Sequence, residues 1–360
     1  MRIAIDVSPL SRPRTGIGSY LLGMVTSLAV LAAGEGLEVV AFAPASRPGA
    51  ARIEEALSGV DLELHTWRLP YAHAWRSAWS RLRHPRAERL LGRFDVLHFS
   101  DWMFPPQRAG IRATTVYDLV PLRFPEWVTP ATRRMHLAKL EHAKATCDLV
   151  FANSQYTARD VVDRLGIASD RVGVAYPGID PRFAVDGERA ERRAPYVLAV
   201  GTIEPRKNLG VLVDAFGLLR RSRPEVELVL AGPAGWGEQP RLDVPGLVAL
   251  GFVDDEELAR LYRGAAAFAY PSRFEGFGIP VVEAMASGAP AVVSAHPSLD
   301  EASGGAALRA DPESPEAFAE ALGRALDVPD DLRHRGLEHA RRFTREACAR
   351  AVLAGYRAAV

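Results

Sequence analysis

The stretch from Tyr270 to Pro290, YPSRFEGFGIPVVEAMASGAP, constrains the fold of this chain most. The apolar run that ends at Tyr270 can form a buried strand, and the glycines that follow let the backbone approach a ligand closely. Pro280 suits the first position of a helix. A strand, a glycine-rich loop and a helix start together favour anion binding, because free N–H groups and the positive end of the helix dipole point the same way. The stretch therefore predicts an α/β domain with a ligand site at a strand end.

Two carboxylates lie in this stretch, Glu275 in the loop and Glu283 in the helix. Carboxylates repel phosphate, so we expect them to face neutral hydroxyls, such as those of a sugar and a ribose, for which they act as acceptors. The alternative is an ordinary strand-to-helix turn with solvated glutamates.

A second stretch has the same plan. The apolar run Tyr196 to Val200 is followed by GTIEPRKN at 201–208 and by helical apolar spacing from Leu209 to Leu219. Arg206 and Lys207 offer a planar fork and a compact charge, which together suit a diphosphate, although such a pair is more often solvated surface. Because the carboxyl ends of parallel strands gather at one edge, we expect the two loops to converge.

GTIEPRKN followed by EGFGIPVVEAMASGAPAVVS resembles the family-4 retaining glycosyltransferases, and the resemblance runs over essentially the whole chain. It implies an α/β fold of the GT-B type, with two doubly wound Rossmann-like domains that face each other across a cleft. It also implies a nucleotide diphosphate sugar as the donor substrate and no cofactor. By this resemblance, Arg206 and Lys207 hold the diphosphate, Glu283 holds the ribose, and Glu275 holds the transferred hexose.

Further donor contacts follow from the resemblance. A glycine-rich loop near the N-terminus approaches the phosphates, and backbone groups after a C-terminal strand cradle the nucleobase. The residues concerned are Gly16, Gly18, Gly201, Thr202, Phe252, Val253, Gly276, Phe277 and Gly278. A dinucleotide fingerprint at the first of these loops, and with it a dehydrogenase, is a weak alternative because Leu21 occupies the place of the third glycine.

The catalytic candidates of the N-terminal half end two expected strands. Relatives commonly carry HDL where this chain has Tyr117-Asp118-Leu119, and tyrosine is not a base near neutral pH. A retaining front-side displacement needs no such base, because the leaving phosphate can accept the proton. We expect Tyr117 near the sugar and Asp118 and Asp101 on the acceptor side, whereas His98, inside a strand, is expected to be packed.

The chain divides into an expected acceptor-binding domain, 1–180, completed by a final helix within 343–360, and a donor-binding domain, 181–342. Domain closure over the donor is expected. Strands are expected at 3–7, 37–43, 61–66, 95–99, 113–116, 148–152, 196–200, 227–231, 247–250, 266–270 and 291–294.

Composition limits the functional class. The chain has 360 residues and a formal net charge of zero, which gives no reason to expect nucleic-acid binding. The two cysteines favour the cytoplasm, and we expect neither a signal peptide nor an apolar run long enough to cross a bilayer. No metal site is expected, because no cluster of ligands with suitable spacing is evident.

One segment departs from the average. Residues 75–93 contain six arginines, two tryptophans and a single acid, Glu88. Such a mixture is typical of an element that contacts an anionic membrane peripherally, here at the inner face of the plasma membrane. A solvated basic helix whose tryptophans pack inward is equally compatible with it.

These observations lead to one main hypothesis and two alternatives. YDLVPLRFPEW at 117–127 is similar to segments of mannosyltransferases. The main hypothesis is therefore a retaining, metal-independent transferase that moves a hexose, first of all mannose from GDP-mannose. The acceptor would be a glycan or a polyprenyl-linked glycan in cell-envelope or exopolysaccharide synthesis. The alternatives are a UDP-sugar-dependent glucosyl or N-acetylhexosaminyl transferase and a non-catalytic protein that binds sugar nucleotides.

Overall fold

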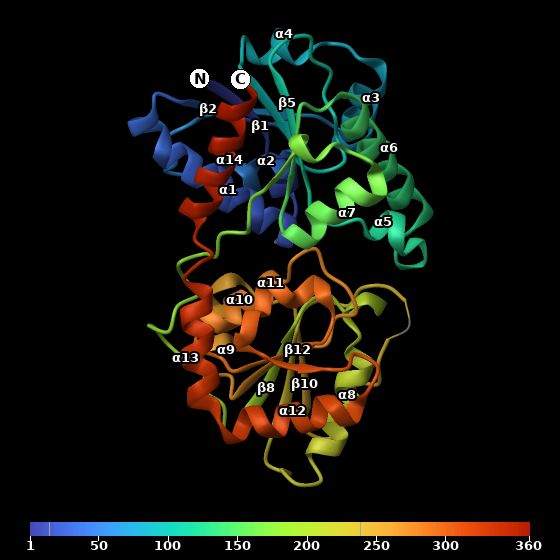
Figure 1. Ribbon diagram of the computed structural model, residues 1–360, viewed down its shortest axis with the longest axis vertical. Coiled ribbons are helices and arrows are strands. Elements are labelled where there is room, and N and C mark those ends of the chain that lie inside the picture. Colours follow the sequence, from blue (N-terminus) through green and yellow to red (C-terminus); the bar gives the residue numbers. More distant parts are fainter. Residues whose placement is uncertain (14, 238) are drawn as a thin grey trace. The chain divides into compact units, whose positions relative to one another are not determined.

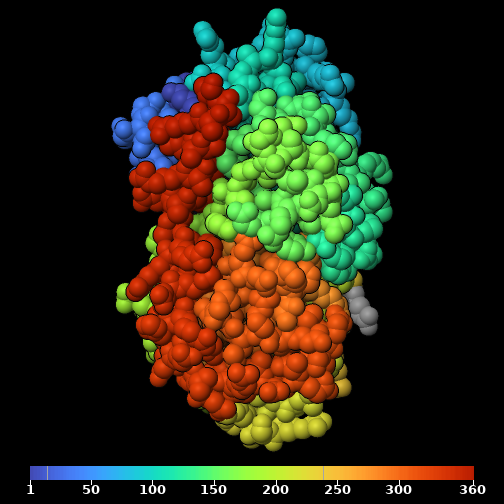
Figure 2. All heavy atoms as spheres, viewed as in Figure 1, coloured from blue at the N-terminus to red at the C-terminus, as the bar shows by residue number. Residues whose placement is uncertain are grey.

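A computed structural model describes residues 1–13, 15–237 and 239–360. The chain forms two compact units, shown in Figures 1 and 2. Unit 1 contains Met1–Gly178 and Thr344–Val360, and unit 2 contains Ile179–Phe343. The last helix of the chain therefore belongs to the same unit as the first strand.

Unit 1 is a seven-stranded parallel sheet in the order β3-β2-β1-β4-β5-β6-β7. Its strands are β1 (Arg2–Asp6), β2 (Glu38–Ala45), β3 (Glu63–Arg68), β4 (Val96–Phe99), β5 (Ile111–Val116), β6 (Leu149–Ala152) and β7 (Val172–Val174). Its helices are α1 (Gly16–Glu35), α2 (Arg47–Ala56), α3 (Ala72–Leu82), α4 (Ala87–Leu91), α5 (Val120–Arg123), α6 (Pro130–Thr146), α7 (Gln155–Leu165) and α14 (Arg345–Ala359).

The inner strands of unit 1 are apolar and buried, as expected for a parallel sheet covered by helices on both faces. Side-chain oxygens stabilise several helix starts: Thr15 accepts a hydrogen bond from the N–H of Gly18, and Ser154 accepts one from that of Thr157. Helix α14 completes the core, because the Tyr356 hydroxyl lies 2.6 Å from Nδ1 of buried His98.

Unit 2 is a six-stranded parallel sheet in the order β10-β9-β8-β11-β12-β13. Its strands are β8 (Tyr196–Val200), β9 (Glu227–Ala231), β10 (Leu247–Gly251), β11 (Ala267–Tyr270), β12 (Ala291–Ser294) and β13 (Leu308–Ala310). Its helices are α8 (Leu209–Leu219), α9 (Asp255–Gly264), α10 (Ile279–Ala286), α11 (Asp300–Ser303), α12 (Pro315–Asp327) and α13 (Pro329–Ala340).

The two sheets share one strand order, except that unit 1 has the additional edge strand β7. In each, the chain starts in the middle, builds strands outward on one side, and then returns to build on the other side. The direction reverses between β1 and β4 in unit 1 and between β8 and β11 in unit 2. In doubly wound sheets, ligands bind outside the carboxyl ends of the strands at such a reversal. The prediction of two doubly wound domains is confirmed.

Two expectations about elements were incomplete or wrong. The short edge strands β7 and β13 were not expected as strands, and each has only three residues. The expectation that no segment is apolar and long enough to cross a bilayer was wrong for α1, which passes by length and composition and lies near the N-terminus. Its apolar stretch is 44% buried within the structure, and core helices and signal sequences pass the same test.

Candidate functional site at the carboxyl edge of unit 2

The loops after β8 and β11 meet at the carboxyl edge of the unit 2 sheet. These strands are neighbours, with Phe268 opposite Leu198 in the register. The backbone N–H of Arg273 donates to the carbonyl of Arg206 at 2.9 Å, so the loops are joined directly. The structure thus brings together the two stretches that the sequence predicts to converge.

Glu275 is the centre of this site. Its two carboxylate oxygens accept hydrogen bonds from Arg206 Nη1 at 2.5 Å and from Lys207 Nζ at 2.7 Å. The hydroxyl of Tyr270 donates to Glu275 at 3.0 Å, and the hydroxyl of Ser298 accepts from the Glu275 backbone N–H at 3.0 Å. Only 7% of Glu275 is exposed, so both ion pairs lie in a largely water-free setting.

A second buried carboxylate, Glu204, completes the charge balance. It accepts from Arg206 Nε at 3.0 Å and lies 2.8 Å from Arg206 Nη2. Two cations therefore lie against two carboxylates, and the arginine fork is engaged on both edges. The cluster as it stands is formally neutral.

Burial and charge pairing act on these groups in opposite directions. Burial raises the pKa of Glu275, but Arg206 and Lys207 outweigh it and lower that pKa to about 2. Burial also lowers the pKa of Lys207 below its usual range, although Glu275 favours the charged form. We conclude that Glu275 is ionised at neutral pH and that Lys207 is held charged by its partners rather than by water.

Tyr270 links the two charges. Its hydroxyl lies 2.6 Å from Lys207 Nζ, and the same ammonium is 4.7 Å from the centre of the Tyr270 ring. Burial, followed by the nearby Glu275, raises the pKa of this phenol well above its usual value. Tyr270 therefore remains a neutral hydroxyl that orients Lys207 toward Glu275.

Backbone geometry explains the residue types around the cluster. Gly278, the N-cap of α10, has φ 105°, and a Cβ there would lie 2.8 Å from Leu299. Asn208 has φ 54° and donates through Nδ2 to the carbonyl of Pro271 at 3.2 Å. The Asn208 amide thus holds the loop after β8 against the loop after β11, and Gly278 lets the start of α10 approach Leu299 closely.

The remaining donor-side candidates lie at the same edge but are not all part of the cluster. Glu283 is buried in α10, where it accepts from the hydroxyl of Tyr262 at 3.2 Å. Phe277 is 2% exposed and packs 5.2 Å from the Phe343 ring, so its side chain is a core residue. Phe252 and Val253 follow β10, and β9 separates that strand from β8. Gly201, Thr202 and Gly276 lie in the loops after β8 and β11.

In unit 1, the sequence candidates gather at the carboxyl edge of β4 and β5. Tyr117 packs edge-on against Tyr20 at 5.3 Å, and Asp118 accepts from the Val120 N–H at 2.9 Å. Asp101 is partly buried after β4. His98 is fully buried and hydrogen bonded through both ring nitrogens, which agrees with the expectation of a packed residue.

The N-terminal glycines also lie at this edge. Gly16 is the first residue of α1 and Gly18 follows within its first turn, where a Cβ would lie 3.4 Å from Thr15 Oγ1. The start of α1 therefore presents backbone rather than side chains.

Sequence reasoning missed four buried polar residues near these edges: Glu204, Tyr270, Asp6 and Arg76. Asp6 ends β1 and is fully buried, and its Oδ1 accepts from the Ser8 N–H at 2.9 Å. Burial is the main cause that raises the pKa of Asp6 to about 6. A charged residue at the end of an apolar strand was the available signal.

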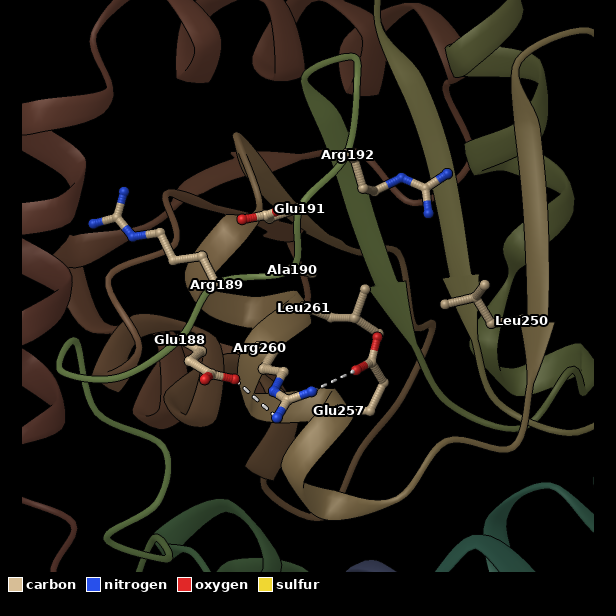
Figure 3. A pocket seen from close by; sticks show the side chains of 9 residues that line it. All are labelled: Glu188, Arg189, Ala190, Glu191, Arg192, Leu250, Glu257, Arg260 and Leu261. Carbon is tan, nitrogen blue, oxygen red and sulfur yellow. Dashed lines mark ion pairs between the residues drawn. The ribbon is translucent and has the colours of Figure 1, made fainter.

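The surface hollow in Figure 3 lies elsewhere in unit 2. Charged residues of the 188–192 segment and of α9 line it, and Arg260 pairs there with Glu188 at 2.9 Å and with Glu257 at 3.9 Å. It contains none of the candidate residues. Within the described ranges, no group of three or more His, Cys, Asp or Glu side chains could hold a metal ion, and metal independence stays a prediction.

Comparison with known proteins places this geometry in a family. Residues 17–183 match the model of Glycosyltransferase Family 4, and residues 194–327 match that of Glycosyl transferases group 1. The chain is 30% identical over 400 residues to the O-antigen chain mannosyltransferase B of Escherichia coli, covering 99% of this chain and 100% of that protein. It is 29% identical over 412 residues to the D-inositol 3-phosphate glycosyltransferase of Nocardia farcinica, covering 99% and 89%.

The fold is likewise shared with solved structures. Anabaena HepE in complex with UDP-glucose superposes with a TM-score of 0.71 at 16% identity, over 98% of each chain. The motifs, the two sheets and the whole-length similarity agree with one another. This chain belongs to the family-4 glycosyltransferases and has the GT-B fold.

Proposed function

We propose that this glycosyltransferase is a retaining, metal-independent enzyme that transfers mannose from GDP-mannose to a glycan or a polyprenyl-linked glycan in cell-envelope or exopolysaccharide synthesis. The observation that carries the proposal is the buried cluster of Arg206, Lys207 and Glu275 at the topological reversal of unit 2. The whole-length similarity to an O-antigen mannosyltransferase supports mannose as the sugar.

The cluster suits a donor diphosphate for a physical reason. Arg206 and Lys207 supply three or more N–H donors within one small volume, and they already hold an anion, the carboxylate of Glu275. A diphosphate carries the same kind of acceptor oxygens. In this proposal Arg206 and Lys207 bind the diphosphate, Glu275 accepts hydrogen bonds from the hexose, and Glu283 accepts from the ribose.

The remaining candidates take subsidiary roles in the proposal. Backbone groups after β10 hold the base, and the start of α1 and the loops after β8 and β11 approach the phosphates. The residues are Phe252, Val253, Gly16, Gly18, Gly201, Thr202, Gly276, Phe277 and Gly278. Tyr117 and Asp118 lie toward the sugar and the acceptor.

The proposed transfer forms a bond from the acceptor oxygen to the sugar C1 while the bond from C1 to the diphosphate oxygen breaks on the same face. The acceptor proton passes to the leaving phosphate, so no protein base is required. Negative charge grows on the diphosphate in the transition state, where preorganised cations are most effective. Arg206 and Lys207 would supply that stabilisation.

A UDP-sugar donor is the second candidate, because the similar fold of HepE holds UDP-glucose. Incubation of the purified protein and a polyprenyl-linked glycan acceptor with GDP-mannose, UDP-glucose or UDP-N-acetylglucosamine, with detection of the released nucleoside diphosphate, separates the two. We expect release from GDP-mannose alone, absent in a folded Glu275→Ala variant. Release from a UDP-sugar alone would replace GDP-mannose in the proposal.

A thermal melt adds a readout that does not need the acceptor. A nucleotide at about 100 times its dissociation constant should stabilise the fold by roughly 2.7 kcal/mol. GDP should raise the melting temperature and UDP should not. Binding of a nucleotide without turnover of any donor would favour the non-catalytic alternative.

A further inference from the structure

Helices α3 and α4 form a surface of unit 1 that the proposed function does not use. Their buried sides are well defined: the Trp79 ring lies 6.2 Å from Phe42 and 6.0 Å from Trp67, and its Nε1 donates to the carbonyl of Pro85 at 2.6 Å. Arg76 is also buried, 4.8 Å from the Trp102 ring. One of the two tryptophans in segment 75–93 therefore packs inward.

The other aromatic and apolar side chains of the two helices face solvent. Tyr71 is 86% exposed, Trp75 53%, Leu82 69% and Leu90 38%. Trp75 and Leu82 are seven residues apart on α3 and therefore lie on one side of the helix, and exposed Tyr71 is its N-cap; we call these three residues the stripe. Contiguous apolar patches that a soluble protein exposes often mark interaction sites.

The same surface is strongly basic. Five exposed arginines surround the stripe: Arg81, Arg83, Arg86, Arg89 and Arg93. None of them forms an ion pair with the residues that the structure describes, whereas exposed arginines of unit 2 do, such as Arg241 with Asp243 and Arg260 with Glu188. Figure 2 shows side chains of this cyan part of the chain projecting from unit 1.

The single acid of the segment does not offset this charge at the surface. The Glu88 carboxylate accepts hydrogen bonds from the backbone N–H groups of Arg108 and Ala109, at 2.5 and 3.0 Å. These bonds tie the carboxylate to the loop before β5. Burial raises the pKa of Glu88, but these bonds and, less strongly, Arg86 lower it. The surface therefore combines unpaired guanidinium groups with aromatic and aliphatic side chains.

We propose that this surface, defined by Tyr71, Trp75, Leu82, Leu90 and the five arginines, docks on an anionic lipid membrane. Trp and Tyr favour the headgroup region, leucine enters the acyl boundary, and arginine attracts anionic headgroups. Because the whole chain has a formal net charge of zero, the attraction would come from the local excess of arginine and not from the overall charge. The proposal is independent of the donor and acceptor of the enzyme.

The test is co-sedimentation of the full chain with vesicles of phosphatidylcholine alone and with 30% phosphatidylglycerol, roughly the anionic content needed for surface attraction. We expect binding to the anionic vesicles only, and weaker binding as salt rises. Trp75→Ala should reduce the bound fraction severalfold. The matched control is Trp236→Ala, because Trp236 of unit 2 is 49% exposed.

A charge reversal tests the contribution of the arginines to membrane binding. The triple change Arg83→Glu, Arg86→Glu and Arg89→Glu should reduce binding by more than about tenfold. Its control is the change of exposed Arg221, Arg341 and Arg342 to glutamate. Circular dichroism verifies folding in every variant.

Three results would overturn the proposal: no binding of the wild type to anionic vesicles at low salt, equal binding to both vesicle types, or equal losses in the patch and control variants. Retention of a single-stranded RNA oligonucleotide without vesicle binding would identify a different partner.

Discussion

The two sheets have the same strand order around their reversal points. At their carboxyl edges, however, the buried carboxylates lie in opposite electrostatic settings. Glu275 in unit 2 accepts from two cations, and its pKa falls to about 2 despite burial. Asp6 in unit 1 is buried and forms no ion pair with the residues that the structure describes, and burial raises its pKa to about 6. Both sheets thus have a reversal point at which a ligand can bind. The side chains at that point determine which of the two edges is organised to hold an anion.

We call the carboxyl edge of unit 2, where Glu275 lies against Arg206 and Lys207, the paired edge. The largest effect is expected from removing one of its two cations. Arg206→Ala should lower kcat by about 10²- to 10³-fold, or roughly 3–4 kcal/mol, because it removes charge stabilisation of the leaving diphosphate. Steady-state kinetics with the donor that turns over measures it. Arg241→Ala, a change at an exposed arginine of the same unit, is the control. Near wild-type turnover of Arg206→Ala would contradict the diphosphate assignment.

The next largest effect is on folding stability at neutral pH, to which Glu275 and Asp6 contribute in opposite directions. A folded-state pKa of about 2 against 4.5 means that Glu275 stabilises the fold above pH 4.5, by on the order of 3 kcal/mol. This contribution is lost as the pH falls toward 2. Glu275→Gln should therefore lower the free energy of unfolding at pH 7, as measured by urea denaturation.

Ionisation of Asp6 changes the free energy of unfolding in the opposite direction. Its folded-state pKa of about 6 against 3.8 favours the fold below pH 3.8, and this contribution is lost as the pH rises through 6. Asp6→Asn should therefore stabilise the protein at pH 7 by up to about 3 kcal/mol, with little effect at pH 3.8. If both variants were destabilised equally at pH 7, the electrostatic contrast between the edges would be wrong.

Sequence patterns predicted the paired edge well because its signals are local. Apolar runs ended at the strand ends observed for β8, β9 and β12, and the loops after β8 and β11 converge as expected. Edge strands β7 and β13 were missed, because three residues carry too little periodicity to be recognised.

The rest of the site depends on contacts between distant segments. Glu204 stands within the recognised motif, but its pairing with Arg206 becomes visible only when the loop is folded. Tyr270 reads as the last apolar residue of a strand, and its hydroxyl acquires a role only beside Lys207. Trp75 and Trp79 lie in the same arginine-rich segment. Only the packing of the folded chain shows that Trp75 is exposed and that Trp79 lies in the core. Spatial neighbours, rather than residue types, separate these cases.

The smallest effect sharpens the comparison within the paired edge itself. Tyr270→Phe retains the ring that packs against Lys207 and removes only the hydroxyl that bonds Lys207 and Glu275. A neutral hydrogen bond contributes about 0.5–1.5 kcal/mol, so kcat/KM should fall roughly 3- to 10-fold while the fold remains intact.

Tyr262→Phe, which removes the hydroxyl that bonds Glu283, is the matched change at the proposed ribose contact. We expect it to raise KM for the donor with little change in kcat, because the ribose is bound equally in the ground state and the transition state. Tyr270→Phe should instead lower kcat, since Lys207 is proposed to act on charge that develops during transfer. A rise in KM with unchanged kcat in Tyr270→Phe would show that Tyr270 serves binding alone.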